Sequence, residues 1–230
     1  MVQPGDVISY LEMCREEGVN LQRGMNFHLH GEFSVILMSL RKGAPYADRV
    51  EDGGRVLIYE GHDLPKRSAA QDPKIVDQPM TNPSGTLTQN GLFYRAAVKY
   101  KNGSGQPEFV RVYEKIHSGI WAYNGLFKLV DAWQEKSGAR RVFKFKLEAV
   151  DDIESSPIEQ KEIDHTRLIP ASVKLEVRSR DKGQCVICGS KDNLHFDHII
   201  PYSRGGSSLV AENVQLLCAR HNLAKRNRIE

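Results

Sequence analysis

The sequence predicts an α+β protein with a large β-rich domain, residues 1–150, and a small metal-stabilised domain, residues 171–230. Short runs of β-branched and aromatic residues, separated by turn signals, fill most of the first segment. Three of the four cysteines lie in the second segment, which is too short to build a large core from side chains alone. Residues 151–170 are acidic and lack a strand pattern, so we interpret them as a linker.

The elements follow in order from these patterns. Residues 5–18 have apolar side chains at helical spacing and end at a glycine, which predicts a short helix. Strands are predicted at 33–40, 55–61, 92–100, 108–116, 125–133 and 141–150, with turn signals such as 101–107 between them. Together they predict one mainly antiparallel sheet curled into a barrel. A helix over 171–181 and a strand over 194–201 complete the pattern.

Composition limits the class of protein. The chain has 230 residues, is 40% hydrophobic and carries a net charge of +3, which fits packed globular domains. The acidic segment 151–170 separates two mildly basic blocks, and basic blocks suit a polyanion such as DNA, although many solvated surfaces are as basic. No apolar stretch approaches the roughly 18 residues of a membrane helix. The first residues lack a secretory pattern, so we expect a cytoplasmic protein with no membrane partner.

The cysteine cluster predicts a structural zinc site. Cys185 and Cys188 form one C-x-x-C pair, and Cys218 and His221 form a second pair with the same spacing. In a reducing compartment, clustered cysteines favour metal binding over disulfides. Four such ligands close a tetrahedral site and leave no position for water, which makes the zinc structural.

Several polar residues between and after these pairs are not needed for zinc. They are His195, Asp197, His198, Asn213 and Asn222. In a strand, His195 and Asp197 point to one face and His198 to the other. An Asp–His pair followed by a proline, a Gly-Gly loop and a helix with an asparagine predicts a functional site.

The C-terminal motifs resemble the HNH nucleases of the ββα-metal type. The matching stretches are C185VIC188, D197H198IIP, Gly205–Gly206, E212N213 and C218ARH221N222LAK. His221 stands where many zinc-bearing members have a fourth cysteine. The resemblance implies that His198 is the general base, that Asp197 and Asn222 hold a catalytic Mg²⁺ or Mn²⁺, and that Asn213 steadies the base or its loop. These roles suit phosphodiester hydrolysis, since a neutral imidazole accepts a proton near pH 7 and oxygen ligands suit hard cations.

The first domain resembles the SRA (YDG) family, which has a PUA-like barrel and reads 5-methylcytosine. The resemblance lies in the stretches 44–63, 77–82, 110–116 and 121–133. It implies that a flipped base is held between Tyr46 and Tyr59 while a carboxylate reads its amine. Asp48 is our candidate carboxylate; Arg49 occupies the direct match to the family's acidic residue, so Glu51 or Asp52 could serve instead. The Tyr-Asp-Gly signature reads Tyr123-Asn124-Gly125, a change we interpret as structural.

These resemblances predict a modification-dependent DNA endonuclease similar to the bacterial SRA–HNH (type IV-like) restriction enzymes. Its expected partner is duplex DNA with 5-methylcytosine or 5-hydroxymethylcytosine, and we expect a homodimer. Lys66, Arg67, Arg140 and Arg141 are candidate DNA contacts. Three alternatives stay open: an HNH nuclease with a barrel that does not flip bases, a non-cutting reader of modified DNA, and a homing or repair nuclease.

Overall fold

The computed structural model describes residues 2–65, 72–150, 169–201, 206–208 and 210–225. The strands are β1 (Asp6–Ser9), β2 (Met25–Leu29), β3 (Phe33–Met38), β4 (Arg49–Glu51), β5 (Val56–Glu60), β6 (Glu108–His117), β7 (Ile120–Ser137), β8 (Arg140–Ala149), β9 (Leu194–His198) and β10 (Val214–Cys218). The helices are α1 (Tyr10–Glu16), α2 (Gln89–Lys101), α3 (Ala171–Arg180) and α4 (Ala219–Lys225), with 3₁₀ turns η1 (Asp52–Gly54) and η4 (Ala211–Asn213). The expected linker and the candidate contacts Lys66 and Arg67 lie outside the described residues, except for 169 and 170.

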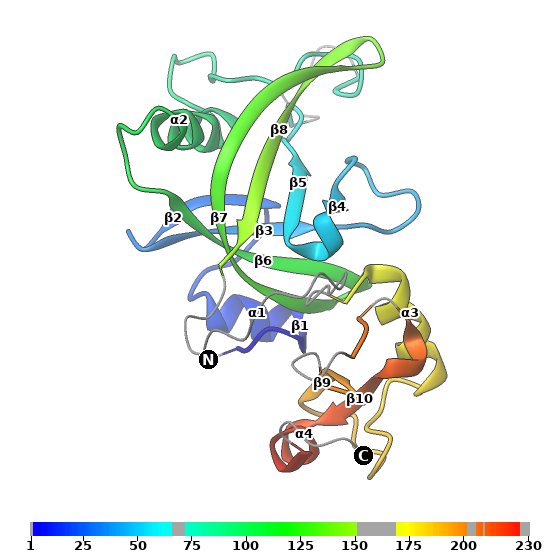
Figure 1. The fold of residues 1–230 in the computed structure, drawn as a ribbon. Helices are drawn as coiled ribbons and strands as arrows, with labels where there is room; N and C mark the ends of the chain where they lie inside the picture. The colour runs from blue at the N-terminus through cyan, green and yellow to red at the C-terminus, as the bar shows by residue number, and fades with distance from the viewer. Residues whose placement is uncertain (1, 66–71, 151–168, 202–205, 209, 226–230) are drawn as a thin grey trace.

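The ten strands in the described ranges form one mixed sheet around the long strand β7 (Figure 1). The first part of β7 pairs with β6 and the last part with β8, so one strand links two halves of the curled sheet. From β6 the sheet continues to β3 and β2, and from β8 to β5 and β4. The β3–β6 pair is parallel, while the other pairs are antiparallel. The predicted α+β class with a β-rich first domain is confirmed.

The predicted strand at 92–100 is wrong, because this segment lies within helix α2. Thr88 caps the helix by accepting a hydrogen bond from the Gly91 backbone N–H. Phe93 and Ala97, one turn apart, are both fully buried in the main core. The spacing of the apolar residues is therefore helical, and the aromatic content of the segment misled the prediction.

The predicted helix over 5–18 is only half right. Residues Asp6–Ser9 form strand β1, and the helix begins after Ser9. Ser9 and Glu12 make a reciprocal capping box, which fixes the start of α1. The preceding residues pair with β7 instead, because tertiary pairing outweighs their helical spacing.

Three hydrophobic clusters stabilise the fold. The largest lies between the curled sheet and α2 and includes Phe93, Phe127 and Phe145. A second cluster lies around α1, and a third joins α3 to β9 and β10. Helix α3 and strand β9, both expected from the sequence, therefore lie together in one small C-terminal unit.

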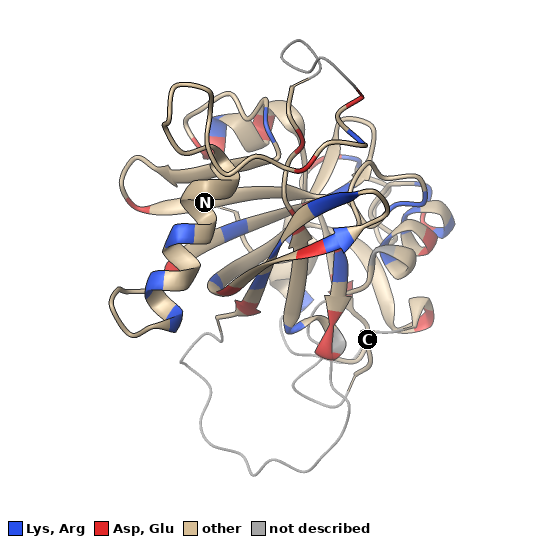
Figure 2. Ribbon diagram, turned by 90° about the horizontal axis from the view of Figure 1, so that it is seen from above, with Lys and Arg blue, Asp and Glu red and all other residues tan. Residues whose placement is uncertain are grey.

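Charge is mixed over the surface. Figure 2 shows basic and acidic residues mixed over most elements, although helix α2 carries Arg95, Lys99 and Lys101 and no acidic residue. Charge alone therefore does not locate a DNA-binding face. None of the helices in the described part of the chain has the length and apolar character needed to cross a membrane.

Candidate functional site

The four predicted zinc ligands lie together. Cys185 and Cys188 lie in the turn between α3 and β9, Cys218 ends β10, and His221 is in α4; their ligand atoms all lie within 4.8 Å of one another. The sulfurs of Cys188 and Cys218 are 3.8 Å apart, and His221 Nδ1 lies 3.4 Å from Cys185 Sγ and 3.3 Å from Cys218 Sγ. A tetrahedral zinc with bonds of about 2.3 Å to sulfur places its ligands about 3.8 Å apart. The donors therefore fit a zinc ion.

The electrostatics of Cys185 agree with metal binding. Burial acts to raise the pKa of this thiol, but backbone N–H groups of Cys218, Cys188 and Ile187 outweigh it and lower the pKa to about 6. A thiolate is the form that ligates zinc. Among the residues that the structure describes, this is the cluster that gathers three or more His, Cys, Asp or Glu ligands.

Asp197 and His198 end strand β9, which pairs with β10 so that His198 lies opposite Val214. His198 Nε2 lies 2.7 Å from the hydroxyl oxygen of the buried Ser208. Burial lowers the pKa of His198, with Lys225 adding to the shift and Asp197 opposing it. The imidazole is therefore neutral near pH 7, the form that can accept a proton.

The Asn213 side chain joins Ile200, just after β9, to Ser207. Its side-chain oxygen accepts a hydrogen bond from Ile200 N at 2.8 Å, and its amide nitrogen donates to the carbonyl oxygens of Ile200 (3.2 Å) and Ser207 (2.9 Å). Gly206 precedes Ser207, and a Cβ there would lie 1.8 Å from Ile200 O. The Asn213 amide thus holds Ile200 and Ser207 together, and the close approach of Gly206 to Ile200 leaves no room for a side chain at position 206.

The Asp197 carboxylate has an ammonium partner. Lys225, the last residue of α4, places Nζ 2.6 Å from Asp197 Oδ2 and also donates to the His198 carbonyl oxygen. Its side chain is almost fully buried. Asn222 is three residues earlier on α4, so Asn222 and Lys225 share one helix face.

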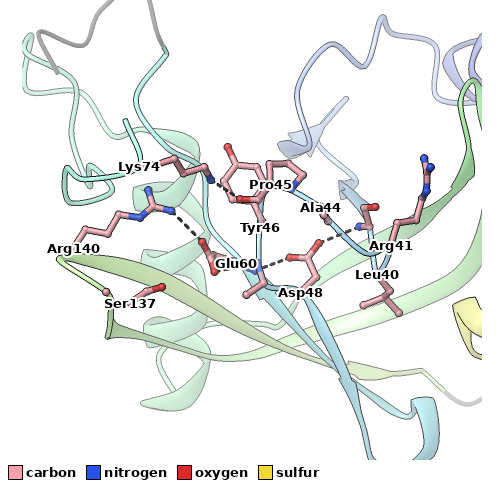
Figure 3. A pocket seen from close by; sticks show the side chains of 14 residues that line it. Leu40, Arg41, Ala44, Pro45, Tyr46, Asp48, Glu60, Lys74, Ser137 and Arg140 are labelled. Carbon is pink, nitrogen blue, oxygen red and sulfur yellow. Dashed lines mark hydrogen bonds and ion pairs between the residues drawn. The ribbon is translucent and has the colours of Figure 1, made fainter. Parts of the chain in front are cut away.

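A second candidate site is a cavity of about 840 Å³ in the β-rich domain. Tyr46, Asp48, Tyr59 and His62 all line it. Figure 3 shows Tyr46 and Asp48 at an adjoining pocket of about 480 Å³. Of the three candidate carboxylates, Asp48 lines both, whereas Glu51 is paired with Arg49 at 2.7 Å and Asp52 is exposed in η1.

The Asp48 carboxylate is held by the backbone. It accepts hydrogen bonds from Ser39 N at 3.1 Å and Glu60 N at 3.0 Å. Burial raises its pKa to about 6, although these backbone donors act to lower it. Each carboxylate oxygen keeps a further lone pair for a ligand.

Tyr59 differs from the open stacking ring that we expected. Its side chain is 2% exposed, and its hydroxyl lies 2.9 Å from His62 Nε2 and 3.2 Å from Gly24 O. The His62 ring stacks on Tyr46 with centroids 5.1 Å apart and planes 13° apart. His62 therefore contacts both proposed tyrosines and takes a stacking position on Tyr46.

The expectation that Arg140 reaches DNA is also corrected in this structure. Its side chain is 5% exposed, and its guanidinium pairs with Asp63 and Glu60. Figure 3 shows the pair with Glu60, in which the two atoms are 3.3 Å apart. The pairing places Arg140 in the wall of the smaller pocket. Arg141, the next residue, is exposed.

Comparison with known families decides the relationship of the chain. Residues 1–152, more than half of the sequence, match the SAD/SRA domain. The chain belongs to the SAD/SRA domain family. Residues 185–228 match the HNH endonuclease family, so the SAD/SRA domain is followed by an HNH endonuclease domain. Both family resemblances seen in the sequence are confirmed.

Solved structures with similarity to this SAD/SRA–HNH chain include two kinds. One is the SUVH5 SRA domain in complex with hemi-methylated CG DNA, at 25% identity over 68% of this chain and 94% of that chain, with a TM-score of 0.46. The other is the modification-dependent TagI restriction endonuclease, at 22% identity over 98% of this chain and 78% of that chain, with a TM-score of 0.43. No curated protein matches the chain.

Two residues at these SRA and HNH sites escaped the sequence analysis. His62 follows Tyr59 by three positions, but only the folded loop brings its ring onto Tyr46. Lys225 follows Asn222 at helical spacing, which is a signal that the sequence offers.

Proposed function

We propose that this protein is a modification-dependent DNA endonuclease. Its SRA domain takes 5-methylcytosine or 5-hydroxymethylcytosine out of duplex DNA, and its HNH domain hydrolyses a nearby phosphodiester bond. The observation that carries the proposal is that one chain joins an aromatic cavity holding a carboxylate to a hairpin bearing Asp197 and His198. We also propose a cytoplasmic location.

In the proposed reaction, His198 takes a proton from the attacking water as the new P–O bond forms and the scissile P–O bond breaks. In the neutral ring one nitrogen carries a lone pair, and that nitrogen receives the proton. Asp197 and Asn222 are the residues that would hold Mg²⁺ or Mn²⁺, since oxygen ligands suit hard cations. When bound, such an ion stabilises the charge that develops on the phosphate and the leaving oxygen.

In the proposed recognition step, the flipped base stacks against Tyr46 and Tyr59, and Asp48 accepts a hydrogen bond from its amine. Because the His62 ring already stacks on Tyr46, we propose that it swings aside when the base enters. Its backbone need not move: His62 N donates to Asn90 Oδ1 and the Asn90 amide donates to His62 O, both at 2.8 Å.

The position of His62 also favours a second candidate, an HNH nuclease with a barrel that binds DNA without flipping a base. The two differ in their dependence on the modified base. The second predicts equal binding and equal cleavage of modified and unmodified duplexes.

The test uses one duplex sequence prepared with a single cytosine, 5-methylcytosine or 5-hydroxymethylcytosine. Wild-type protein should bind and cut a modified duplex preferentially, in the presence of Mg²⁺ or Mn²⁺. His198→Ala should bind with the same preference and cut roughly 10²–10⁴ times more slowly, because it lacks the general base. Unchanged cleavage by His198→Ala would exclude His198 as the general base.

Tyr46→Ala is the matching variant on the recognition side. Tyr46 is partly exposed, so its truncation disturbs the core less than truncation of the buried Tyr59. Loss of one base–aromatic stack should weaken binding of the modified duplex roughly 5- to 150-fold. Preference that survives in Tyr46→Ala would show that Tyr46 does not stack on the modified base, whereas equal binding of modified and unmodified duplexes by wild type would favour the second candidate.

A further inference from the structure

The two domains share a strand. β1 pairs with β7 of the SRA sheet on one side and with β9 of the HNH hairpin on the other (Figure 1). Asp6 lies opposite His195, and His195 Nδ1 is 2.5 Å from Asp6 Oδ1. The β9 strand that carries Asp197 and His198 is therefore part of the same sheet as the barrel.

The backbone at this junction is closely fitted. Phe196 N donates a hydrogen bond to Gly5 O at 3.2 Å. Gly5 has a φ of +98°, and a Cβ there would lie 3.1 Å from Phe196 O. A glycine is required here, since a side chain would meet both a strained backbone and the neighbouring strand.

A buried polar group joins the domains at a second place. Lys174 on α3 donates to Glu114 Oε2 on β6 at 2.8 Å and to Asn124 Oδ1 on β7 at 2.6 Å. The Asn124 amide donates to the same Glu114 oxygen at 3.1 Å. The exposed fractions are 2% for Lys174, 0% for Glu114 and 7% for Asn124. A buried ammonium leaves its partners only at a high cost, so this contact resists sliding and opening.

This contact also accounts for Tyr123-Asn124-Gly125 in place of the Tyr-Asp-Gly signature. An aspartate at 124 would place a second carboxylate beside Glu114, with one ammonium for both. Asparagine instead accepts from Lys174 and donates to Glu114. An asparagine at position 124 is therefore compatible with the packing of helix α3 against the barrel.

We propose that the shared strand and the Lys174–Glu114–Asn124 contact form a rigid dock that fixes the nuclease site relative to the base cavity. The dock, and not the length of residues 151–168, then sets the distance between the modified base and the cut. Lys174 is a positioning residue in this arrangement. The prediction about the cut rests on the proposed function, whereas the dock itself does not.

The first experiment tests the dock without DNA. A protease site is inserted in residues 151–168 of the full chain and cut after folding. The two pieces should elute as one species from a size-exclusion column at micromolar concentration. The Lys174→Met and Asn124→Asp variants should release the pieces at lower salt or urea than wild type. Pieces that separate at once in wild type would overturn the dock, whatever the protein does to DNA.

The second experiment maps cuts on a duplex with one modified cytosine. Wild type should cut at a single phosphate or an adjacent pair at a fixed distance from the modified cytosine, and a flexible insertion in 151–168 should leave this position unchanged. Lys174→Met should spread the cuts while keeping the zinc content of wild type, which shows that the HNH domain is folded. Cuts that shift or spread with the insertion alone would overturn the proposal. If wild type cut modified and unmodified duplexes equally and at the same positions, the proposed function would be contradicted and the dock would not.

Discussion

The His62 imidazole contacts Tyr46 and Tyr59, so base entry must displace it if those rings hold the base. Displacement breaks a ring stack and the hydrogen bond with the Tyr59 hydroxyl, worth about 1–3 kcal/mol together. His62→Ala should therefore tighten binding roughly 5- to 150-fold on both modified and unmodified duplexes, with their ratio unchanged. Tyr59→Phe removes the hydroxyl's hydrogen bonds with His62 and Gly24 but keeps the stacking of His62 on Tyr46, so it should give a smaller gain. Weaker binding by His62→Ala in the same titration would mean that the imidazole is a wall of the pocket.

Asp48 predicts a pH dependence of recognition. Burial raises its pKa to about 6 and Glu60 adds to this, while backbone N–H groups and Lys144 oppose it. Because the folded pKa exceeds the usual 3.8, the stability that this group contributes is full below pH 3.8 and is lost as the pH rises through about 6. Binding has the opposite sign, since the proposed contact needs the carboxylate.

Affinity for the modified duplex should thus fall roughly tenfold between pH 7 and pH 5, one proton being taken up per site. His62 does not titrate in this range, because burial lowers its pKa to about 4. Asp48→Asn should bind more weakly at pH 7 and show no such slope. An equal slope in wild type and Asp48→Asn would assign the titration to another group.

Sequence reasoning succeeded for residues whose partners are fixed by local spacing. Cys185 and Cys188 are one turn apart, as are Cys218 and His221, so two local pairs predicted one cluster. The packing of His62 on Tyr46 and the inward turn of Arg140 depend on loops and strands far apart in sequence. Neither has a local signal.

At the scale of elements, the periodicity of apolar residues predicted most of the long strands. It failed where pairing with an adjacent strand determines the secondary structure. The strands β3, β5, β6, β7, β8 and β9 lie where alternating or continuous apolar runs placed them. Residues Asp6–Ser9 look helical by spacing and become strand β1 because β7 and β9 offer hydrogen bonds on both sides. This effect cannot be predicted from the local sequence, because the pairing strands are distant in the chain.

The small C-terminal elements should depend on zinc. Cys188 is exposed, so Cys188→Ala removes a ligand with little loss of packing. We expect it to lose the bound zinc and to unfold α4 and the β9–β10 hairpin, because structural zinc contributes roughly 10–16 kcal/mol in small domains. Elemental analysis and thermal unfolding with and without a chelator measure this. Cys14→Ala, outside the cluster, is the control; a Cys188→Ala protein with one zinc and wild-type melting would refute the assignment.

At the scale of the whole molecule, one HNH site can face one DNA strand at a time. A double-strand break then needs two protomers or two successive nicks, and we propose a homodimer because two-fold assemblies are the commonest. The rate of double-strand cleavage should rise with the square of enzyme concentration below the dimer's dissociation constant. First-order dependence with no nicked intermediate, for a protein that sediments as a monomer, would contradict this.

The position of β1 between β7 and β9 has a consequence for how the chain acquires activity during synthesis. β1 is made before β9, and the whole barrel lies between these two paired strands in the sequence. Contacts of such long range form late, since the intervening chain must first be ordered. The hairpin with Asp197 and His198 should therefore consolidate only after the barrel, so that a nascent or half-folded chain cannot cut DNA that it has not yet read. In refolding followed by pulsed hydrogen exchange, amides of β6 and β7 should gain protection before those of β9, and the reverse order would show that the nuclease matures alone.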